Sequence, residues 1–156
     1  MSPGYRALRE GAAVLDLSGR AKIRVTGEDR ARLLHAMTTN DVQGLQPGQG
    51  CYLFFLNAQG RILADANLFC FDDHLLLDLE PETREKVYEH LDRYIIADDV
   101  MVENQTDSLA TIAVEGPGAQ RVLSGIGAPL PEADHAWLAW GTRIVARTDS
   151  TGSGGA

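Results

Sequence analysis

The chain has 156 residues, of which 44% are hydrophobic and 23% charged, a composition typical of one folded domain. This balance argues against a disordered chain or a coiled coil. No apolar run reaches the roughly 18 residues of a membrane-spanning helix, and the N-terminal residues contain no apolar signal segment. We therefore expect a cytoplasmic protein without membrane partners. Cys51 and Cys70 are too few for a disulfide framework or for a metal site made of thiolates alone.

The formal net charge of −8 is unevenly distributed. Residues 62–110 contain 13 acidic and three basic residues, whereas residues 6–32 contain seven basic ones. A nucleic-acid-binding surface combines basic with aromatic residues, and the only aromatic residue next to the basic segment is Tyr5. Nucleic acid is therefore not an expected partner, while the acidic segment could bind a partner protein.

Hydrophobic periodicity and turn residues predict mixed strands and helices. In chain order, strands are expected at residues 14–17, 21–26, 51–57, 61–69, 74–79, 100–103 and 109–114. Helices are expected from a capping box at 26–29 to about residue 37, over 81–96, and briefly through residues 122 and 123. The apolar stripe of the 81–96 helix is Val87, Leu91, Tyr94 and Ile95. Turn residues at 57–60 join two strands as a hairpin, so we expect an α+β fold with a largely antiparallel sheet and helices on one face.

The hairpin contains the most distinctive polar residues. Asp65 and Asn67 are two apart in an otherwise apolar strand, so their side chains lie on the same face of the sheet. A buried carboxylate there must be paired, hydrogen-bonded or directed at a ligand, and Tyr52 on the partner strand could supply an aromatic wall. The same pattern fits the solvent face of an amphipathic strand, so alternation alone leaves both interpretations open.

No familiar catalytic motif is present. The four histidines are 39, 16 and 45 residues apart, and no two have the spacing that places metal ligands on one helix face. Neither a nucleophile elbow nor a phosphate-binding glycine loop occurs. No metal site or catalytic group is predicted from motifs alone.

Several short motifs follow one another along the chain: VLDLS at 14–18, TTNDV at 38–42, PGQGCY at 47–52, LNAQGRILAD at 56–65, TREK at 83–86 and AVEGP at 113–117. Their order resembles the N-terminal part of the folate-binding T-protein superfamily. This superfamily includes the aminomethyltransferase of the glycine cleavage system and the YgfZ-type proteins linked to iron–sulfur cluster assembly. The resemblance covers nearly the whole chain and implies the superfamily's folate-binding domain over residues 1–147.

Two departures favour the YgfZ branch. The aminomethyltransferases have GGILDDL in the second hairpin strand, and its first aspartate is their acid–base residue. The matching residue is Ala64, which cannot exchange a proton, and only Asp65 is retained. The sequence HLDRYIIADDV at 90–100 also resembles the YgfZ branch. The resemblance thus implies a YgfZ-like folate-binding protein that is not an enzyme and that acts, with a protein partner, in iron–sulfur cluster assembly or maintenance.

The resemblance also implies a ligand site. Tetrahydrofolate is the expected cofactor, and the residues expected to line one edge of its cavity are Tyr52, Asp65, Asn67, Phe69 and Glu80. The two aromatic rings would flank a flat ring of the ligand, and the polar groups would bond to its pterin edge. Two alternatives stay open: an aminomethyltransferase that transfers a one-carbon unit to tetrahydrofolate, and a non-catalytic protein-interaction domain.

The last residues resemble a block that continues in the superfamily. RTDSTGSGG at 147–155 resembles its Arg-Thr-x-x-Thr-Gly-Glu-x-Gly block, with Ser153 at the position of the Glu. We therefore expect residues 148–156 to be a flexible Gly/Ser-rich end and a truncation point, with the rest of the ligand site missing.

Overall fold

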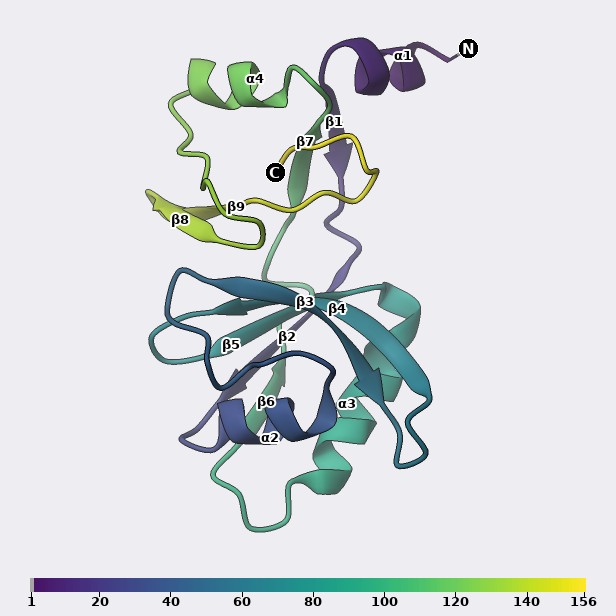
Figure 1. Ribbon diagram of the computed structural model, residues 1–156, viewed down its shortest axis with the longest axis vertical. Helices are drawn as coiled ribbons and strands as arrows, with labels where there is room; N and C mark the ends of the chain where they lie inside the picture. The colour runs from purple at the N-terminus through teal and green to yellow at the C-terminus, as the bar shows by residue number, and fades with distance from the viewer. Residues whose placement is uncertain (1) are drawn as a thin grey trace. The chain divides into compact units, whose positions relative to one another are not determined.

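A computed structural model describes residues 2–156, and the chain forms two compact units (Figure 1). Unit 2 is the continuous segment 19–110, and unit 1 joins the first 18 residues to residues 111–156. The α+β fold with antiparallel strands is confirmed. The boundary between the units does not coincide with the expected boundary at residue 147.

Unit 2 is a five-stranded antiparallel sheet with helices on one face (Figure 1). The strands are in the order β3-β4-β5-β2-β6. In chain order, the elements are β2 (Ala21–Thr26), α2 (Arg30–Met37), β3 (Gly50–Leu56), β4 (Ile62–Cys70), β5 (Leu75–Leu79), the 3₁₀ helix η1 (Pro81–Thr83), α3 (Arg84–Tyr94) and β6 (Met101–Asn104).

The predicted hairpin of β3 and β4 is confirmed. The side-chain oxygen of Asn57 accepts hydrogen bonds from the backbone N–H groups of Gln59 and Arg61, each at 2.9 Å. Gly60 has a φ of +75°, which is a left-handed conformation that glycine adopts without steric cost. The turn is therefore built by local chemistry that is visible in the sequence.

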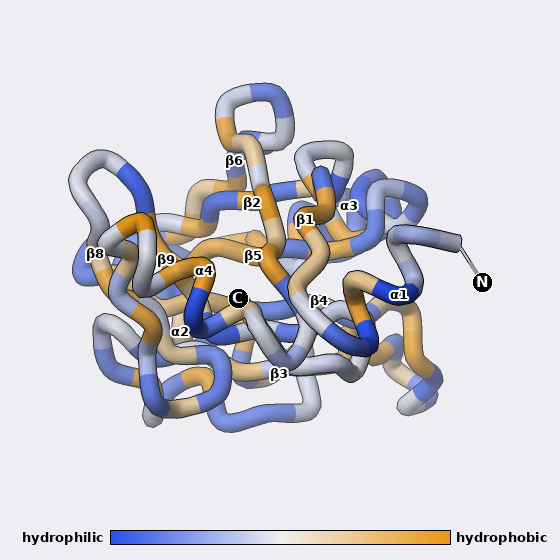
Figure 2. The backbone as a smooth tube through the Cα atoms, turned by 90° about the horizontal axis from the view of Figure 1, so that it is seen from above, coloured by the Kyte–Doolittle hydropathy of each residue, from blue (hydrophilic) through white to orange (hydrophobic). Residues whose placement is uncertain are grey.

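One face of the sheet forms the core of unit 2. Alternate residues of each strand are buried, for example Leu53 and Phe55 in β3, and α2 and α3 add Leu34, Val87 and Leu91. Figure 2 shows the central strand β5 mainly in orange, the colour of hydrophobic residues. The expected helical stripe is partly wrong, because α3 ends at Tyr94 and that side chain is 43% exposed.

The capping box expected at residues 26–29 is wrong. Thr26 is the last residue of β2 and pairs with Met101 of β6, so its backbone belongs to the sheet. Gly27 then turns the chain with a φ of +100°, and α2 begins only at Arg30. The Asp29 side chain bonds instead to the backbone N–H of Asp99, at 2.9 Å.

Unit 1 contains a two-stranded sheet, a β-hairpin and two short helices. Its elements are α1 (Pro3–Glu10), β1 (Ala13–Asp16), β7 (Ile112–Glu115), α4 (Ala119–Gly125), β8 (Trp137–Trp140) and β9 (Arg143–Ala146). β1 pairs antiparallel with β7, and β8 with β9. The sequence did not predict α1, β8 or β9. The small core consists of Val114, Ala119, Leu123, Ala128 and Val145.

The last residues of the chain lie along β7, and the flexibility and truncation expected for residues 148–156 stay predictions. Val114 and Ala156 exchange two backbone hydrogen bonds, at 2.7 and 3.1 Å. The buried carboxylate of Glu115 accepts bonds from the N–H and hydroxyl of Ser150, at 3.0 and 2.6 Å. A Cβ atom on Gly155 would lie 2.3 Å from the carbonyl oxygen of Val114, so this close approach requires glycine.

Within residues 2–156, none of the helices is long and apolar enough to cross a membrane. The cytoplasmic location expected from the sequence stays a prediction.

Candidate functional site

The face of the unit 2 sheet opposite the helices carries a row of polar side chains. Residues 64, 66 and 68 of β4 point into the core, so alternation places Asp65, Asn67 and Phe69 on the other face. Tyr52 lies directly opposite Asn67 on β3. Four of the five expected site residues therefore share one face of two neighbouring strands.

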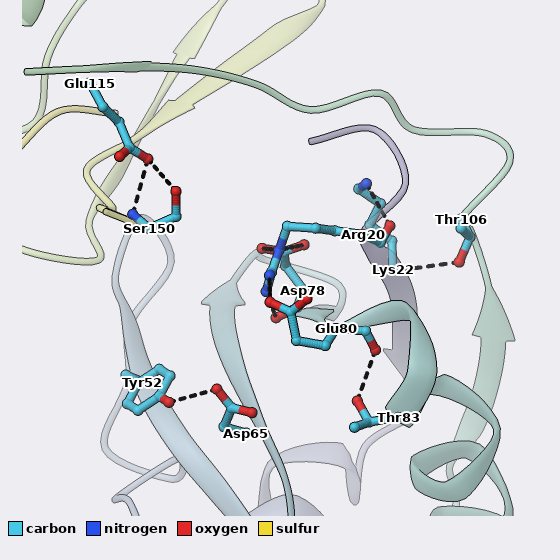
Figure 3. Close-up of polar contacts among 10 residues, drawn as sticks. All are labelled: Arg20, Lys22, Tyr52, Asp65, Asp78, Glu80, Thr83, Thr106, Glu115 and Ser150. Carbon is cyan, nitrogen blue, oxygen red and sulfur yellow. Dashed lines mark hydrogen bonds and ion pairs between the residues drawn. The ribbon is translucent and has the colours of Figure 1, made fainter. Parts of the chain in front are cut away.

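A short hydrogen bond joins two of these residues. The Tyr52 hydroxyl donates to Oδ2 of Asp65 at 2.6 Å, the length typical of a bond to a charged carboxylate (Figure 3). This bond raises the pKa of Tyr52 above its usual value. The ring of Tyr52 is 43% exposed and packs edge-on against Phe54, with the ring centres 5.3 Å apart. The arrangement offers an aromatic surface beside a carboxylate of fixed orientation.

An arginine links the other polar residues of this face. Arg20 Nε lies 3.1 and 3.0 Å from the two oxygens of Asp78, and the same guanidinium bonds to Glu80 (Figure 3). Burial raises the pKa of Asp78, against the effects of Arg20 and of a hydrogen bond from Asn67. The partly buried guanidinium of Arg20 therefore pairs with the carboxylates of Asp78 and Glu80, and Asp78 also accepts a hydrogen bond from Asn67.

A buried lysine lies beside this arginine. Lys22 is 2% exposed and pairs with Asp78 across β2 and β5. Its Nζ donates to the carbonyl oxygen of Arg20 at 2.8 Å. Sequence reasoning missed Arg20, Lys22 and Asp78, although the alternation of Lys22 and Arg24 with apolar residues does place both on the polar face of β2.

The remaining expected site residues are in different surroundings. Phe69 is 6% exposed and pairs with Leu76, so its ring is far less open than that of Tyr52. The Glu80 side chain is 54% exposed and bonds to Arg20 at the end of β5. The network of Arg20 and Asp78 connects Glu80 to Asn67.

Position 64 does not lie on the polar face. Ala64 is 4% exposed, belongs to the core cluster and pairs with the buried Phe55. The carboxylate that faces Tyr52 comes from the next residue, Asp65. The acid–base residue that the resemblance places at position 64 would therefore have a side chain that points toward the helices and away from the polar face.

No group of three or more His, Cys, Asp or Glu residues within 2–156 is arranged to hold a metal ion. The polar face instead combines an aromatic ring, carboxylates, an amide and a guanidinium. These groups suit a flat organic ligand with hydrogen-bonding edges.

The chain matches the model of the GCVT N-terminal domain over residues 2–151. The chain belongs to this family. It is similar to the aminomethyltransferase of Chloroherpeton thalassium, with 30% identity over 97% of this chain and 44% of the relative. It is also similar to the putative transferase At1g60990, chloroplastic, of Arabidopsis thaliana, with 34% identity over 76% of this chain and 28% of the relative.

A solved structure shares the fold. The glycine cleavage system aminomethyltransferase T from Bartonella henselae superposes with a TM-score of 0.82 at 23% identity, over 97% of this chain and 42% of that one. The chain thus spans less than half the length of the GCVT-family relatives it matches.

These relatives correct the expectation that the protein is not an enzyme, because the curated relatives are named transferases. The expectation was inferred from Ala64, whose side chain lies in the core. The matched family and these relatives are named for aminomethyl transfer or as transferases, which shows membership of the GCVT family but does not place the chain in the YgfZ branch.

Proposed function

We propose that the chain is the N-terminal part of a tetrahydrofolate-dependent aminomethyltransferase, and that the polar face of the unit 2 sheet is a wall of its folate site. The observation that carries the proposal is the Tyr52–Asp65 hydrogen bond on this face, in a chain of the GCVT family. Tetrahydrofolate presents a flat pterin rich in N–H donors. An exposed tyrosine ring beside acceptor groups matches both of these properties.

Asp65 is the proposed proton acceptor. A folate nitrogen that bonds to a one-carbon unit uses its lone pair, and the proton that it loses must pass to a nearby base. Tyr52 occupies Oδ2 of Asp65, which leaves Oδ1 as the atom to receive that proton. The hydroxyl of Tyr52 fixes the orientation of the carboxylate. Asp65 matches the second aspartate of the family motif and lies on the ligand side of the strand, and we propose that it takes the acid–base role that the resemblance gives to the first.

The other polar groups are proposed to recognise the pterin edge. Asn67 can donate or accept a hydrogen bond, whereas ionised Glu80 only accepts and so selects an N–H edge. Arg20 fixes Glu80 from one side and balances its charge. Phe69 is proposed to contribute the apolar end of this wall.

The wall is only part of a site. Because the chain covers less than half of its relatives, further residues of the folate cavity and the site for an aminomethyl donor are expected from sequence beyond this segment. The isolated wall is expected to bind with a dissociation constant in the high micromolar range or weaker, equivalent to about 5 kcal/mol or less.

The YgfZ-like role in iron–sulfur assembly is the second hypothesis. It rests on the resemblance of residues 90–100 and on Ala64, and the core position of Ala64 removes the argument that an acid–base group is lost. The names of the relatives favour the transferase.

Calorimetric titration of the 156-residue protein with tetrahydrofolate tests the proposal. Asp65→Asn and Tyr52→Phe should each weaken binding at least threefold, because each removes the charged hydrogen bond. Asp92→Asn in α3 and Tyr5→Phe in α1 are matched controls outside the polar face and should bind as the wild type does. Wild-type binding that neither site variant weakens would contradict the proposal, as would no binding at millimolar ligand.

A further inference from the structure

The segment TTN at 38–40 lies along the outer edge of β3, the strand that carries Tyr52. Thr38 forms an isolated antiparallel bridge with Phe55. The backbone N–H of Thr39 donates to the carbonyl oxygen of Phe54 at 3.1 Å, and the Thr39 hydroxyl accepts from the N–H of Phe54 at 3.0 Å. The side-chain amide of Asn40 donates to the carbonyl oxygen of Tyr52 at 3.0 Å. Three consecutive residues thus bind the outer edge of β3, the edge that does not pair with β4.

Tyr52 lies in an edge strand, so the sheet supports its backbone on one side only. β3 pairs with β4 along one edge, and no other strand of the sheet pairs with its outer edge. The carbonyl of Tyr52 points to the unpaired edge, where it receives the Asn40 amide. β3 begins at Gly50, directly after a turn in which Gly48 has a φ of +90°. Without the Asn40 bond, the start of the strand would have a free edge on one side and a glycine turn before it.

Asn40 is itself held in place. Its side-chain oxygen accepts from the backbone N–H of Asp41 at 2.8 Å, which leaves the amide hydrogens directed at β3. The segment is anchored at its start as well, because the Thr38 hydroxyl donates to the carbonyl oxygen of Leu34 at 2.7 Å, at the end of α2. A rigid support therefore reaches from the helix layer to the edge of the ligand face.

We infer that Asn40 and Thr39 are positioning residues for the site. They fix the position and orientation of Tyr52 and thereby the geometry of the Tyr52–Asp65 hydrogen bond. The inference rests on the proposed function for its consequence in ligand binding, but the geometry it concerns belongs to the free protein. TTN side chains do not touch the ligand in this role. They act through the backbone of the strand that carries the aromatic wall.

The ionisation of Tyr52 reports its position without any ligand. The hydrogen bond to Asp65 raises the pKa of Tyr52 above the ordinary value of 10.0, so a displaced ring should titrate closer to 10.0. Asp65 and Arg20 are the charged groups that act on this phenol, and the substitutions below leave both in place. Protein labelled with ¹³C at the tyrosine ζ carbon allows titration by NMR, and Tyr52→Phe assigns the signal.

Asn40→Ser removes the amide that reaches Tyr52 and adds no charge, and Thr39→Val removes the hydroxyl that accepts from Phe54. Each variant should lower the pKa of Tyr52 toward 10.0 and weaken tetrahydrofolate binding by about threefold to tenfold. Thr106→Val is the matched control, because the Thr106 hydroxyl likewise accepts a strand N–H, that of Lys22, at 3.1 Å. It should cost similar stability and leave the titration of Tyr52 unchanged.

An unchanged titration of Tyr52 in both TTN variants would overturn the inference, as would an equal shift in Thr106→Val. The NMR measurement needs no folate. If the chain does not bind tetrahydrofolate, the proposed function is contradicted, but the NMR titration of Tyr52 still tests whether Asn40 and Thr39 position this residue.

Discussion

Ala64→Asp tests which face of β4 carries the chemistry. A carboxylate at position 64 would enter the core cluster, where Ala64 is 4% exposed and pairs with Phe55. Burial raises the pKa of such a carboxyl by several units, and a rise of about 3 units costs about 4 kcal/mol of unfolding free energy at pH 7. The extra volume costs about 1–3 kcal/mol more. Since total stability for domains is about 5–15 kcal/mol, the variant should be close to unfolded at neutral pH.

Urea denaturation followed by circular dichroism, at pH 4 and at pH 7, measures this cost. The introduced carboxyl has a raised pKa in the folded state, so its penalty is small below the unfolded value and grows as pH rises toward the folded one. Ala64→Asn has a similar shape and cannot ionise, so its loss should be independent of pH. An Ala64→Asp variant with the wild-type midpoint at pH 7 would refute the assignment of the two faces.

Two further predictions concern other buried or paired groups. Burial and the nearby Asp41 raise the pKa of Cys51 to about 11, against an ordinary value of 9.0. At pH 8 its reaction with iodoacetamide should therefore be about a hundredfold slower than that of an unfolded cysteine, and rapid labelling in the native protein would contradict the burial. Burial acts to raise the pKa of Asp149, but bonds from backbone N–H groups, that of Gly154 first, bring it below the ordinary value. This contribution to stability is present above the unfolded pKa and disappears as pH falls through the folded one, so hydrogen-exchange protection of Gly152 and Gly154 should decrease below about pH 4. Asp149→Asn should show the decrease at every pH, and full protection in that variant would contradict the role of the carboxylate.

Local signals in the sequence predict most of unit 2. The turn chemistry of Asn57 and Gly60 and the strict alternation of β2 depend on neighbouring residues, so one sequence is enough to read them. The capping box failed because its first residue is needed by the sheet: Thr26 pairs with Met101, a partner 75 residues away. The local helix-capping propensity of residues 26–29 cannot show that Thr26 is needed for strand pairing instead.

The candidate site was only partly visible for a related reason. Alternation correctly groups Asp65 with Asn67, and the same rule places Ala64 on the opposite face, although the family motif with two adjacent aspartates had suggested that position 64 carries the chemistry. Arg20 lies in a turn before β2 and meets Asp78 only after the chain has crossed the sheet, 58 residues later. No local pattern marks an arginine of this kind. The pairing of β1 with β7 is hidden in the same way, since unit 2 lies between them in the sequence.

That interruption has a consequence for synthesis on the ribosome. Residues 19–110 form a unit whose strands all come from one continuous stretch, so its sheet can be complete while the chain is still growing. β1 leaves the ribosome earlier than any strand of that sheet, yet its partner β7 is made nearly a hundred residues later. At about 5–20 residues per second, the unpaired β1 must wait several seconds or more. β1 is thus made before every strand of unit 2 but can pair only after all of them have been made.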